Sequence, residues 1–284
     1  MNTEVYRFKV GDFECMAVGD GLLIKPPAAI FFANAPKGLL DQVLREHHIQ
    51  PEQWLAFNDP FICVMVNTGR HKVLVDTGAG SFTPNTGRLQ QNLHTVGIEN
   101  SDIDTVILTH GHEDHVGGNT DAQGKPAFPK ARHVMRKEEW PFWTSEKAEK
   151  FYENPELAFI RKNLLLVQHQ MDLIDHEAEI VPGIRAISAP GHTPGHMAVD
   201  IFSNGEELLC VSDAFIHPIH IEHPEWYTTF DMAPEQLIKT RHLLLNKAVN
   251  EKTLMLASHF PFPGIGYVVK RGTGWQWQPI QMLT

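Results

Sequence analysis

The sequence predicts an α+β fold in which two β-sheets are covered by helices. Three observations lead to this expectation: strand-like and helix-like segments are mixed along all 284 residues, no linker divides them, and no repeat of fixed period appears. The apolar fraction of 42% is enough for one sizeable core. We therefore expect a single domain over residues 1–284. Within it, residues 20–60 are expected to be an irregular N-terminal segment that covers a pocket or serves dimerisation.

The strand candidates alternate between polar and apolar residues or are continuously apolar, and they end at turn residues. Segments 4–10 and 13–19 flank a Gly11-Asp12 turn and predict a hairpin. Residues 61–66 and 72–75 predict a second hairpin. Further strands are expected over 104–109, 132–135, 184–188, 197–202, 207–212 and 253–257, with a last hairpin over 267–277.

Helices are expected where apolar residues recur at three- and four-residue spacing. These segments are 39–47, 86–98, 140–152, 155–168 and 233–249. For the last of them, Asp231 is the candidate N-cap and Pro234 falls in the first turn. Phe31 and Phe32 are candidates for the core, or alternatively for a mobile flap or a subunit contact.

The composition argues against several classes of partner. The net charge is −10 and no lysine- or arginine-rich run occurs, so no nucleic-acid partner is expected. No apolar stretch reaches the ~18–20 residues that span a bilayer, and the N-terminus lacks a signal-peptide pattern. We therefore expect a cytoplasmic protein without a membrane partner. Cys15, Cys63 and Cys210 are far apart and are expected to be buried free thiols.

Three histidines and one aspartate lie within six residues, at the end of an apolar strand candidate. The stretch reads Thr109-His110-Gly111-His112-Glu113-Asp114-His115-Val116-Gly117-Gly118. On a helix, residues i and i+2 point in different directions, but on an extended loop they point to the same side, so His110 and His112 can bind one ion there. Asp114 and His115 project differently and suit a second ion.

A site with two metal ions needs more ligands than this loop supplies, and other strand ends offer them. Each of His192, Asp213 and His259 follows or ends a strand candidate. A buried carboxylate such as Asp213 is costly unless it is paired, and two cations would offset that cost. Imidazole and carboxylate ligands without cysteine suit zinc, iron, manganese or cobalt. His196 is expected to be structural or to support the ligands.

These residues resemble the metallo-β-lactamase superfamily. The pattern His110-x-His112-x-Asp114-His115, followed in order by His192, Asp213 and His259, carries the resemblance. It implies a four-layer αββα sandwich with the metals at one sheet edge. Within the superfamily, the chain resembles most the methyl parathion hydrolase-like group, near the acyl-homoserine lactonases. The stretches that carry this finer resemblance are 73–79, 181–184, 191–196 and 257–266.

The resemblance implies a role for each ligand. His110, His112 and His192 would hold one divalent cation, Asp114, His115 and His259 would hold the other, and Asp213 would bridge them. Asp114 and Asp213 are the candidate catalytic carboxylates, and Asp76 and Ser258 are expected to support the ligands from behind. The cations are expected to be zinc, with iron, manganese or cobalt as alternatives. A hydroxide shared between them would attack an ester, lactone or phosphotriester.

Proton donation to the leaving group is the missing part of this scheme. Related lactonases carry a tyrosine three residues after the bridging aspartate, where this chain has Ile216. No tyrosine of the sequence obviously replaces it, although Tyr227 lies in the following loop. The difference predicts a preference for good leaving groups, as in aryl esters and phosphotriesters, and slower opening of lactones. Phe82, Trp143, Ile216 and Phe215 are expected to line an apolar substrate pocket.

Three more histidines, His217, His220 and His223, recur every third residue after the bridging aspartate. Pro218 and Pro224 argue against a regular helix there. We expect these histidines at the pocket rim or on the surface rather than in a third metal site.

Other functions share the fold or part of the ligand pattern. A thioester hydrolase of the glyoxalase II type would need basic residues for glutathione, for which Lys270-Arg271 is the only cluster. A mononuclear-iron persulfide dioxygenase shares most of the ligands. The acidic charge disfavours a nuclease, and His112 stands where a flavodiiron-type redox protein has glutamate. A non-catalytic binding protein would be expected to lose ligands. A homodimer is expected from the resemblance alone.

Overall fold

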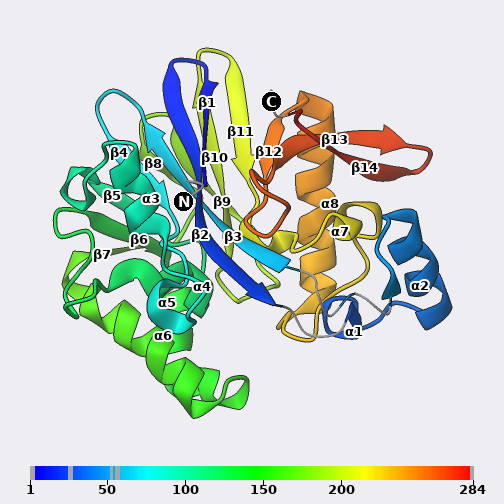
Figure 1. Cartoon of the computed structure of the whole chain (residues 1–284), viewed down its shortest axis with the longest axis horizontal. Helices are drawn as coiled ribbons and strands as arrows, with labels where there is room; N and C mark the ends of the chain where they lie inside the picture. Colours follow the sequence, from blue (N-terminus) through cyan, green and yellow to red (C-terminus); the bar gives the residue numbers. More distant parts are fainter. Residues whose placement is uncertain (1–3, 25–27, 52–53, 55–57, 282–284) are drawn as a thin grey trace.

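Two β-sheets packed face to face form the centre of the molecule in the computed structural model (Figure 1). The structure describes residues 4–24, 28–51, 54 and 58–281. The first sheet contains, in spatial order, β1 (Val5–Val10), β2 (Phe13–Ile24), β3 (Asn58–Asn67), β4 (Lys72–Val75), β5 (Thr105–Ile107), β6 (Arg132–Arg136) and β7 (Met171–Ile174). The second contains β14 (Gly274–Pro279), β13 (Ile265–Arg271), β12 (Leu254–Leu256), β11 (Glu206–Cys210), β10 (Met197–Ser203), β9 (Ile184–Ser188) and β8 (Glu179–Val181).

Helices connect and cover these strands. The α-helices are α1 (Ala28–Phe31), α2 (Lys37–Glu46), α3 (Leu89–Thr95), α4 (Glu113–Val116), α5 (Glu139–Thr144), α6 (Asn154–Leu166), α7 (Ile219–Glu222) and α8 (Pro234–Glu251). Short 3₁₀ turns are η2 (Gly80–Phe82), η3 (Asn100–Asp102), η4 (Gly117–Asn119), η5 (Glu146–Lys150), η6 (Gln168–Gln170) and η7 (Ser212–Ala214).

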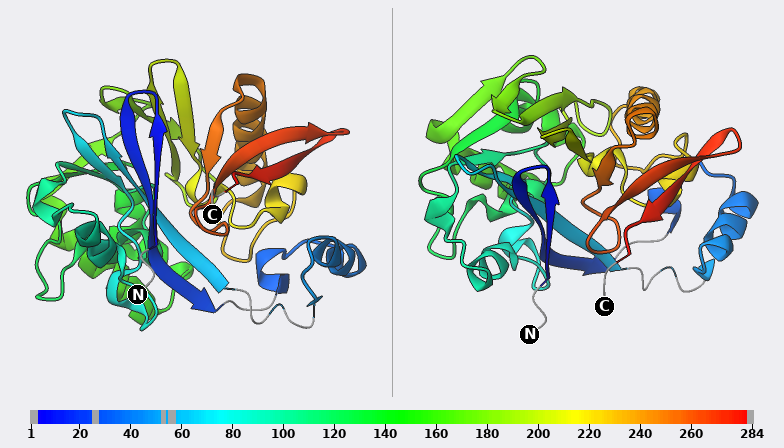
Figure 2. Two further views of the ribbon diagram at one scale, coloured as in Figure 1. Left: turned by 45° about the horizontal axis from the view of Figure 1, so that its top comes forward. Right: turned by 90° about the horizontal axis from the view of Figure 1, so that it is seen from above.

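Three hydrophobic clusters separate four layers. The first cluster joins β2–β6 to α3, α5 and α6, the second lies between the two sheets, and the third joins β10–β13 to α8. Because side chains alternate along a strand, Leu74 belongs to the first cluster while its neighbours Val73 and Val75 belong to the second. The views in Figures 1 and 2 accordingly keep α3–α6 on one outer side and α8 on the other. The predicted four-layer αββα sandwich is confirmed.

Parallel pairing brings several loops to one edge of the sheets. β4, β5, β6 and β7 pair in parallel, and so do β11 and β12. Parallel neighbours end at the same edge. The polar segments after β4 and β5 therefore lie at one edge of the first sheet, and those after β11 and β12 lie at one edge of the second. The hairpins predicted at the N-terminus, at β3–β4 and at β13–β14 are all present.

Residues 20–60 differ from the irregular segment expected from the sequence. In the described part of this segment, β2 continues to Ile24, and α1 and α2 follow. Phe31 and Phe32 are each 1% exposed and pack against Trp54, so they belong to a core and not to a flap. The core position was one of the two alternatives for Phe31 and Phe32, and the structure places both in one cluster with apolar residues of α2.

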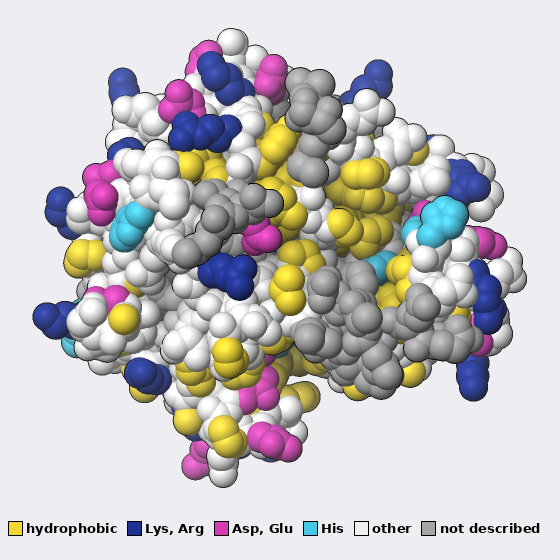
Figure 3. All heavy atoms as spheres, in the orientation of Figure 1, with side chains coloured by type: hydrophobic (Ala, Val, Ile, Leu, Met, Phe, Trp, Pro, Cys, Tyr) yellow, Lys and Arg dark blue, Asp and Glu magenta, His cyan; other side chains and the backbone are white. Residues whose placement is uncertain are grey.

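The surface gives limited information about partners. Basic side chains on the face shown in Figure 3 are scattered and do not form one continuous patch. Among the described residues, no helix combines the length and the apolar character that a membrane span requires.

Candidate metal centre

The candidate ligands come from strand ends and from one short helix. His110 lies in the loop after β5, and Asp114 and His115 lie on α4, whose N-cap is His112. His192 lies between β9 and β10, Asp213 lies in η7 after β11, and His259 follows β12. The structure brings together all seven side chains predicted from the sequence.

These seven side chains form two groups. The first group contains His110, His112, His192 and Asp213, and the second contains Asp114, His115 and His259. Within each group, one ligand-type atom from every residue lies within 4.8 Å of the others. In the first group, His112 Nδ1 lies 2.8 Å from His110 Nε2 and 2.9 Å from His192 Nε2. Three ring nitrogens therefore point at one small volume.

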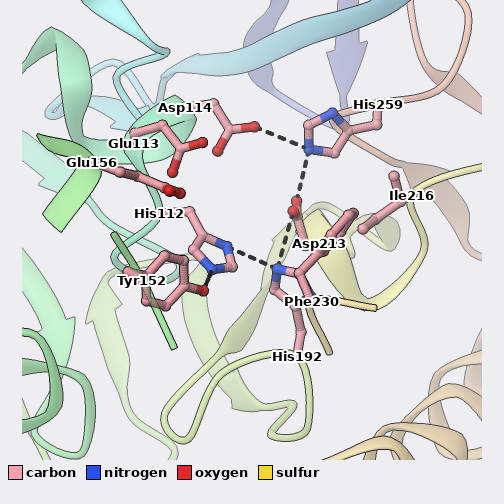
Figure 4. A pocket seen from close by; sticks show the side chains of 10 residues that line it. All are labelled: His112, Glu113, Asp114, Tyr152, Glu156, His192, Asp213, Ile216, Phe230 and His259. Carbon is pink, nitrogen blue, oxygen red and sulfur yellow. Dashed lines mark hydrogen bonds and ion pairs between the residues drawn. The ribbon is translucent and has the colours of Figure 1, made fainter. Parts of the chain in front are cut away.

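Asp213 faces both groups with different oxygens, as Figure 4 shows for His192 and His259. Its Oδ2 lies 3.3 Å from His192 Nε2 and 3.8 Å from His110 Nε2. Its Oδ1 lies 3.1 Å from the Nε2 atoms of both His115 and His259. This is the position that a carboxylate bridging two cations would occupy.

Three of the histidines are held from behind by buried carboxylates. Asp76 Oδ2 lies 2.8 Å from His115 Nδ1, and Asp231 Oδ1 lies 2.7 Å from His192 Nδ1. Likewise, Asp59 Oδ1 lies 3.1 Å from His259 Nδ1. A carboxylate that accepts the Nδ1 proton fixes the tautomer and leaves Nε2 free to bind a metal.

Asp76 and Asp231 illustrate how the loops are built for this purpose. Asp76 has a φ of 61°, an unusual value for a residue other than glycine, and the loop turns sharply out of β4 there. Asp231 was expected to cap α8, but the N-cap of this helix is Ala233. Asp231 instead accepts a hydrogen bond from Thr228 N with one carboxylate oxygen and faces His192 with the other. The prediction for Asp231 as a helix cap is therefore wrong.

The remaining histidine nitrogens also have partners. Thr109 Oγ1 lies 3.1 Å from His110 Nδ1, and the Tyr152 hydroxyl contacts His112 Nε2. His196 accepts a hydrogen bond from Asp213 N at Nε2, and its Nδ1 lies 2.9 Å from Ala189 O. His196 thus holds the loop of the bridging carboxylate, as the structural interpretation of this residue predicts.

Glu139, at the start of α5, ties two ligand loops together. Its Oε2 accepts hydrogen bonds from Gly111 N at 3.0 Å and from Trp143 Nε1 at 2.5 Å. Its Oε1 accepts from Thr193 Oγ1 at 2.6 Å and from Gly195 N at 2.7 Å. Gly111 itself is required by close packing, since a Cβ there would lie 2.2 Å from Trp143 Nε1.

The electrostatics of the site favour cations. Burial alone lowers the pKa of a histidine, but neighbouring carboxylates, above all Asp213, outweigh burial and raise the pKa of His192 to about 9 and of His259 to about 10. Burial also raises a carboxyl pKa, yet the histidines, first His259 and then His115, hold the pKa of Asp213 well below its usual range. The same carboxylates that attract protons here would attract metal cations.

The buried polar atoms fit a pair of divalent metal ions. The Nε2 atoms of His115 and His259 are buried and have no hydrogen-bond partner among the described residues. Both atoms belong to the group of ligands built around Asp114, and both face Asp213. Nitrogen and oxygen donors without sulfur, arranged in two groups with one shared carboxylate, match a dinuclear site for divalent cations.

A cavity opens above these ligands (Figure 4). One wall carries Glu113, Glu156 and Tyr152, and the opposite wall carries Ile216 and Phe230. The ligands that contribute to its floor and sides are His112, Asp114, His192, Asp213 and His259. None of the lining residues is a lysine or an arginine.

The structure corrects part of the expected pocket. Ile216 lines the cavity, but Phe82, Trp143 and Phe215 do not. Trp143 and Phe215 are fully buried, and Trp143 packs behind His112 with their ring centroids 5.2 Å apart. Phe82 instead packs against Phe159. An aromatic residue next to a site in the sequence can equally support the site from behind, and sequence alone does not distinguish these positions.

Other expected site residues occupy structural positions. Ser258 accepts a hydrogen bond from Ile62 N through its backbone carbonyl, and within the described structure its hydroxyl makes no hydrogen bond to a ligand. His217 and His220 are buried rather than at the surface, and His220 Nε2 lies 3.1 Å from Phe31 O. His223 is partly exposed and stacks on a tryptophan.

Four residues of the site have no counterpart among the sequence predictions: Asp59, Glu139, Tyr152 and Phe230. Asp59 and Glu139 are acidic residues that are both fully buried, which is unusual without a specific role. Their burial is visible only in the folded chain. Tyr152 stood out only as one aromatic residue among several in its stretch.

Comparison with known proteins agrees with this geometry. The family model described as the metallo-beta-lactamase superfamily matches residues 63–259. A protein named N-acyl homoserine lactonase from Bacillus thuringiensis is 25% identical over 252 residues, covering 81% of this chain and 92% of the relative. Two solved structures align over nearly all of both chains. AidC, described as a dizinc quorum-quenching lactonase in complex with a product, N-hexnoyl-L-homoserine, has a TM-score of 0.91, 26% identity and 99% coverage of each chain.

The second structure, the hydrolase AbOPH in the beta lactamase superfamily, has a TM-score of 0.90, 25% identity and 100% coverage of each chain. The family model covers well over half of the chain, and its matched range includes all seven candidate ligands. The chain therefore belongs to the metallo-β-lactamase superfamily.

Proposed function

We propose that the protein hydrolyses the ester bond of lactones and of related uncharged esters at a pair of divalent cations. The observation that carries this proposal is the position of Asp213, whose two oxygens face two separate groups of ligands at the floor of an open cavity. The curated relatives named N-acyl homoserine lactonase and the dizinc lactonase structure support the same chemistry.

Bound between these ligands, two cations would lower the pKa of water, supply a hydroxide nucleophile at neutral pH and stabilise the negative charge that develops on the attacked group. The residues of the chain provide the order that this needs. His110, His112 and His192 are fixed on one side, and Asp114, His115 and His259 on the other. Asp213 sets the separation of the two groups, because it faces both.

The cavity favours a substrate without negative charge. Glu113, Asp114 and Glu156 place three carboxyl groups on one side of the cavity, and the lining contains no lysine or arginine to bind an anionic substrate. Ile216 and Phe230 offer an apolar wall for an acyl or aryl group. This arrangement disfavours the glutathione thioester and nucleic-acid alternatives, because a glutathione thioester carries two carboxylates and a nucleic acid carries one negative charge at every phosphate.

Several finer features belong to the same proposal. Zinc is the metal we expect first, because the donor set suits it and AidC is described as a dizinc enzyme. Aryl esters and phosphotriesters, as the finer resemblance to organophosphate hydrolases implies, are expected as additional substrates. A homodimer and a cytoplasmic location remain predictions, as does the single domain; light scattering of the purified protein tests the dimer.

The proposal is tested on one purified sample by metal analysis and a substrate panel. The panel contains an N-acyl homoserine lactone, an aryl ester, a phosphotriester and S-lactoylglutathione, each measured before and after chelation and after metal is restored. We expect about two metal ions per chain and metal-dependent opening of the lactone. Asp213→Ala should lose both, while Glu138→Gln, a partly exposed neighbour of the site, should keep both. If no metal binds and none supports hydrolysis, the proposal fails.

A further inference from the structure

Tyr152 is the one tyrosine of the described structure whose side chain lines the cavity above the ligands. It lies between η5 and α6, and its ring packs against Trp143 with the ring centroids 4.9 Å apart. Trp143 is in turn held by Glu139 through its indole nitrogen. The Tyr152 ring is therefore supported by a fully buried neighbour.

The contact between Tyr152 and His112 determines which way the phenol proton points. His112 turns Nδ1 towards His110 and His192, so this nitrogen is the one that can bind a cation. A nitrogen that binds a cation carries no proton, and the proton of the neutral ring is then on Nε2. Because Nε2 contacts the Tyr152 hydroxyl, the hydroxyl oxygen accepts this hydrogen bond.

A phenol oxygen that accepts one hydrogen bond still has its own O–H to donate. Within the described structure, the Tyr152 hydroxyl has no other hydrogen-bond partner than His112. Figure 4 shows that Tyr152 and Ile216 line the cavity from different sides. The free O–H is thus available to a molecule bound in the cavity.

We propose that Tyr152 donates a hydrogen bond to the oxygen that leaves when the ester bond of the substrate breaks. This inference rests on the proposed function. In the reaction, a water oxygen forms a bond to the carbonyl carbon, and the bond from that carbon to the leaving oxygen breaks. The leaving oxygen becomes negative, the Tyr152 hydrogen bond stabilises it, and the proton it finally takes comes from the attacking water. Tyr152 itself ends unchanged.

The inference alters the expectation drawn from Ile216. Without a hydroxyl near the leaving oxygen, only substrates with weakly basic leaving groups would react well. The Tyr152 hydroxyl instead donates its hydrogen bond from the wall opposite Ile216. It thereby stabilises alkoxide leaving groups, including the one formed when a lactone opens. Glu113 and Glu156 lie near Tyr152 on the same wall, and neither forms a hydrogen bond with its hydroxyl among the described contacts.

The test is Tyr152→Phe, which removes the hydroxyl and keeps the ring, measured with three hexanoyl substrates. These are p-nitrophenyl hexanoate, phenyl hexanoate and N-hexanoyl homoserine lactone, whose leaving oxygens are increasingly basic. We expect kcat/KM for the lactone to fall about 10- to 100-fold, as for a lost hydrogen bond to a charged group, and for the nitrophenyl ester by less than about 3-fold. The matched control is Tyr227→Phe, since Tyr227 lies outside the cavity lining and should change neither rate.

The ratio of two rates measured on one sample does not depend on how many molecules hold metal, so metal loss in the variant cannot imitate the expected result. A steeper dependence on the leaving group in Tyr152→Phe supports the inference. An equal loss on all three substrates, or no loss, overturns it, since a residue that only positions His112 would affect every substrate alike. If the wild-type protein hydrolyses none of the three with metal bound, the proposed function itself fails.

Discussion

Glu139→Gln is the sharpest test of how the ligand loops are held together. The Glu139 carboxylate is fully buried and accepts four hydrogen bonds, two at each oxygen. Glutamine has nearly the same shape, but one of its two acceptor oxygens becomes an NH2 group. In the variant, the new NH2 group faces two hydrogen-bond donors that the carboxylate oxygen accepted from in the wild type. The side-chain volume hardly changes.

The size of the effect follows from which pair of donors loses its acceptor. The hydroxyl of Thr193 can turn its hydrogen away, whereas the N–H of Gly195 and the donors of Gly111 and Trp143 cannot. The least costly orientation therefore turns the NH2 towards Thr193 and Gly195 and leaves one buried N–H unpaired. An unpaired buried donor costs about 1–3 kcal/mol. The remaining hydrogen bonds are then accepted by a neutral amide oxygen instead of a charged carboxylate, and this weakening costs about as much again.

Part of this cost is offset, because glutamine removes a charge that is expensive to bury. Burial raises the pKa of Glu139 in spite of the hydrogen bonds from Thr193 and Trp143. We therefore expect Glu139→Gln to lower the free energy of unfolding by about 2–4 kcal/mol, a large part of the ~5–15 kcal/mol typical of a domain. The measurement is urea unfolding of metal-free protein, in which metal binding does not contribute.

Glu138→Gln is the matched control, because Glu138 is the neighbouring residue and its side chain is 36% exposed in a pair with Arg136. Arg136 is largely buried, but the partly exposed Glu138 keeps one acceptor oxygen for it as glutamine, so we expect this variant to lose about 1 kcal/mol or less. If Glu139→Gln is no less stable than Glu138→Gln, the four hydrogen bonds do not hold the two loops together and the reasoning is wrong.

Three further predictions follow from single residues. Asp231→Ala removes the hydrogen-bond partner of His192 Nδ1 and should weaken metal affinity about 10- to 100-fold. Metal titration measures this, and an unchanged affinity would contradict the role of Asp231. Burial lowers the pKa of His133 to about 4 in the folded protein, whereas the pKa is about 6.5 in the unfolded chain. Between these two pH values the unfolded chain therefore binds a proton that the folded chain does not. Stability should therefore fall by about 2 kcal/mol from pH 7 to pH 5 through this residue, and urea unfolding of His133→Leu should lack that part of the slope. Burial raises the pKa of Cys15 to about 12, so iodoacetamide at pH 8 should leave this thiol unmodified in the native protein and react with it in urea; labelling of the native thiol would refute this.

The ligands could be predicted from the sequence because each follows a recognisable strand. His110 and Asp213 come directly after apolar runs, in β5 of the first sheet and β11 of the second, and the packing of the two sheets brings these strand ends together. The alternation of apolar residues likewise predicted most strands and the layered architecture. The short strands β7 and β8 were missed, since they are partly exposed and have little apolar pattern.

The residues that support the ligands could not be predicted in the same way. Asp59 lies 200 positions before its partner His259, and nothing in its local sequence marks the pairing. Asp231 satisfied the local pattern of a helix cap, and a long-range contact to His192 took precedence. In both cases the role depends on a contact between distant segments, which exists only once the two sheets have packed.

The same long-range contacts explain how so many buried charges can be tolerated in one place. Asp76, Asp213 and Asp231 are buried beside histidines, and each would be costly alone. Burial lowers the pKa of His115, but the carboxylates of Asp213, Asp76 and Asp114 raise it well above its usual range, so protons balance the charge when no cation does. Metal binding must then displace these protons, which couples it to pH. The arrangement that prepares the site for cations therefore also offsets the cost of burying its carboxylates when no cation is bound.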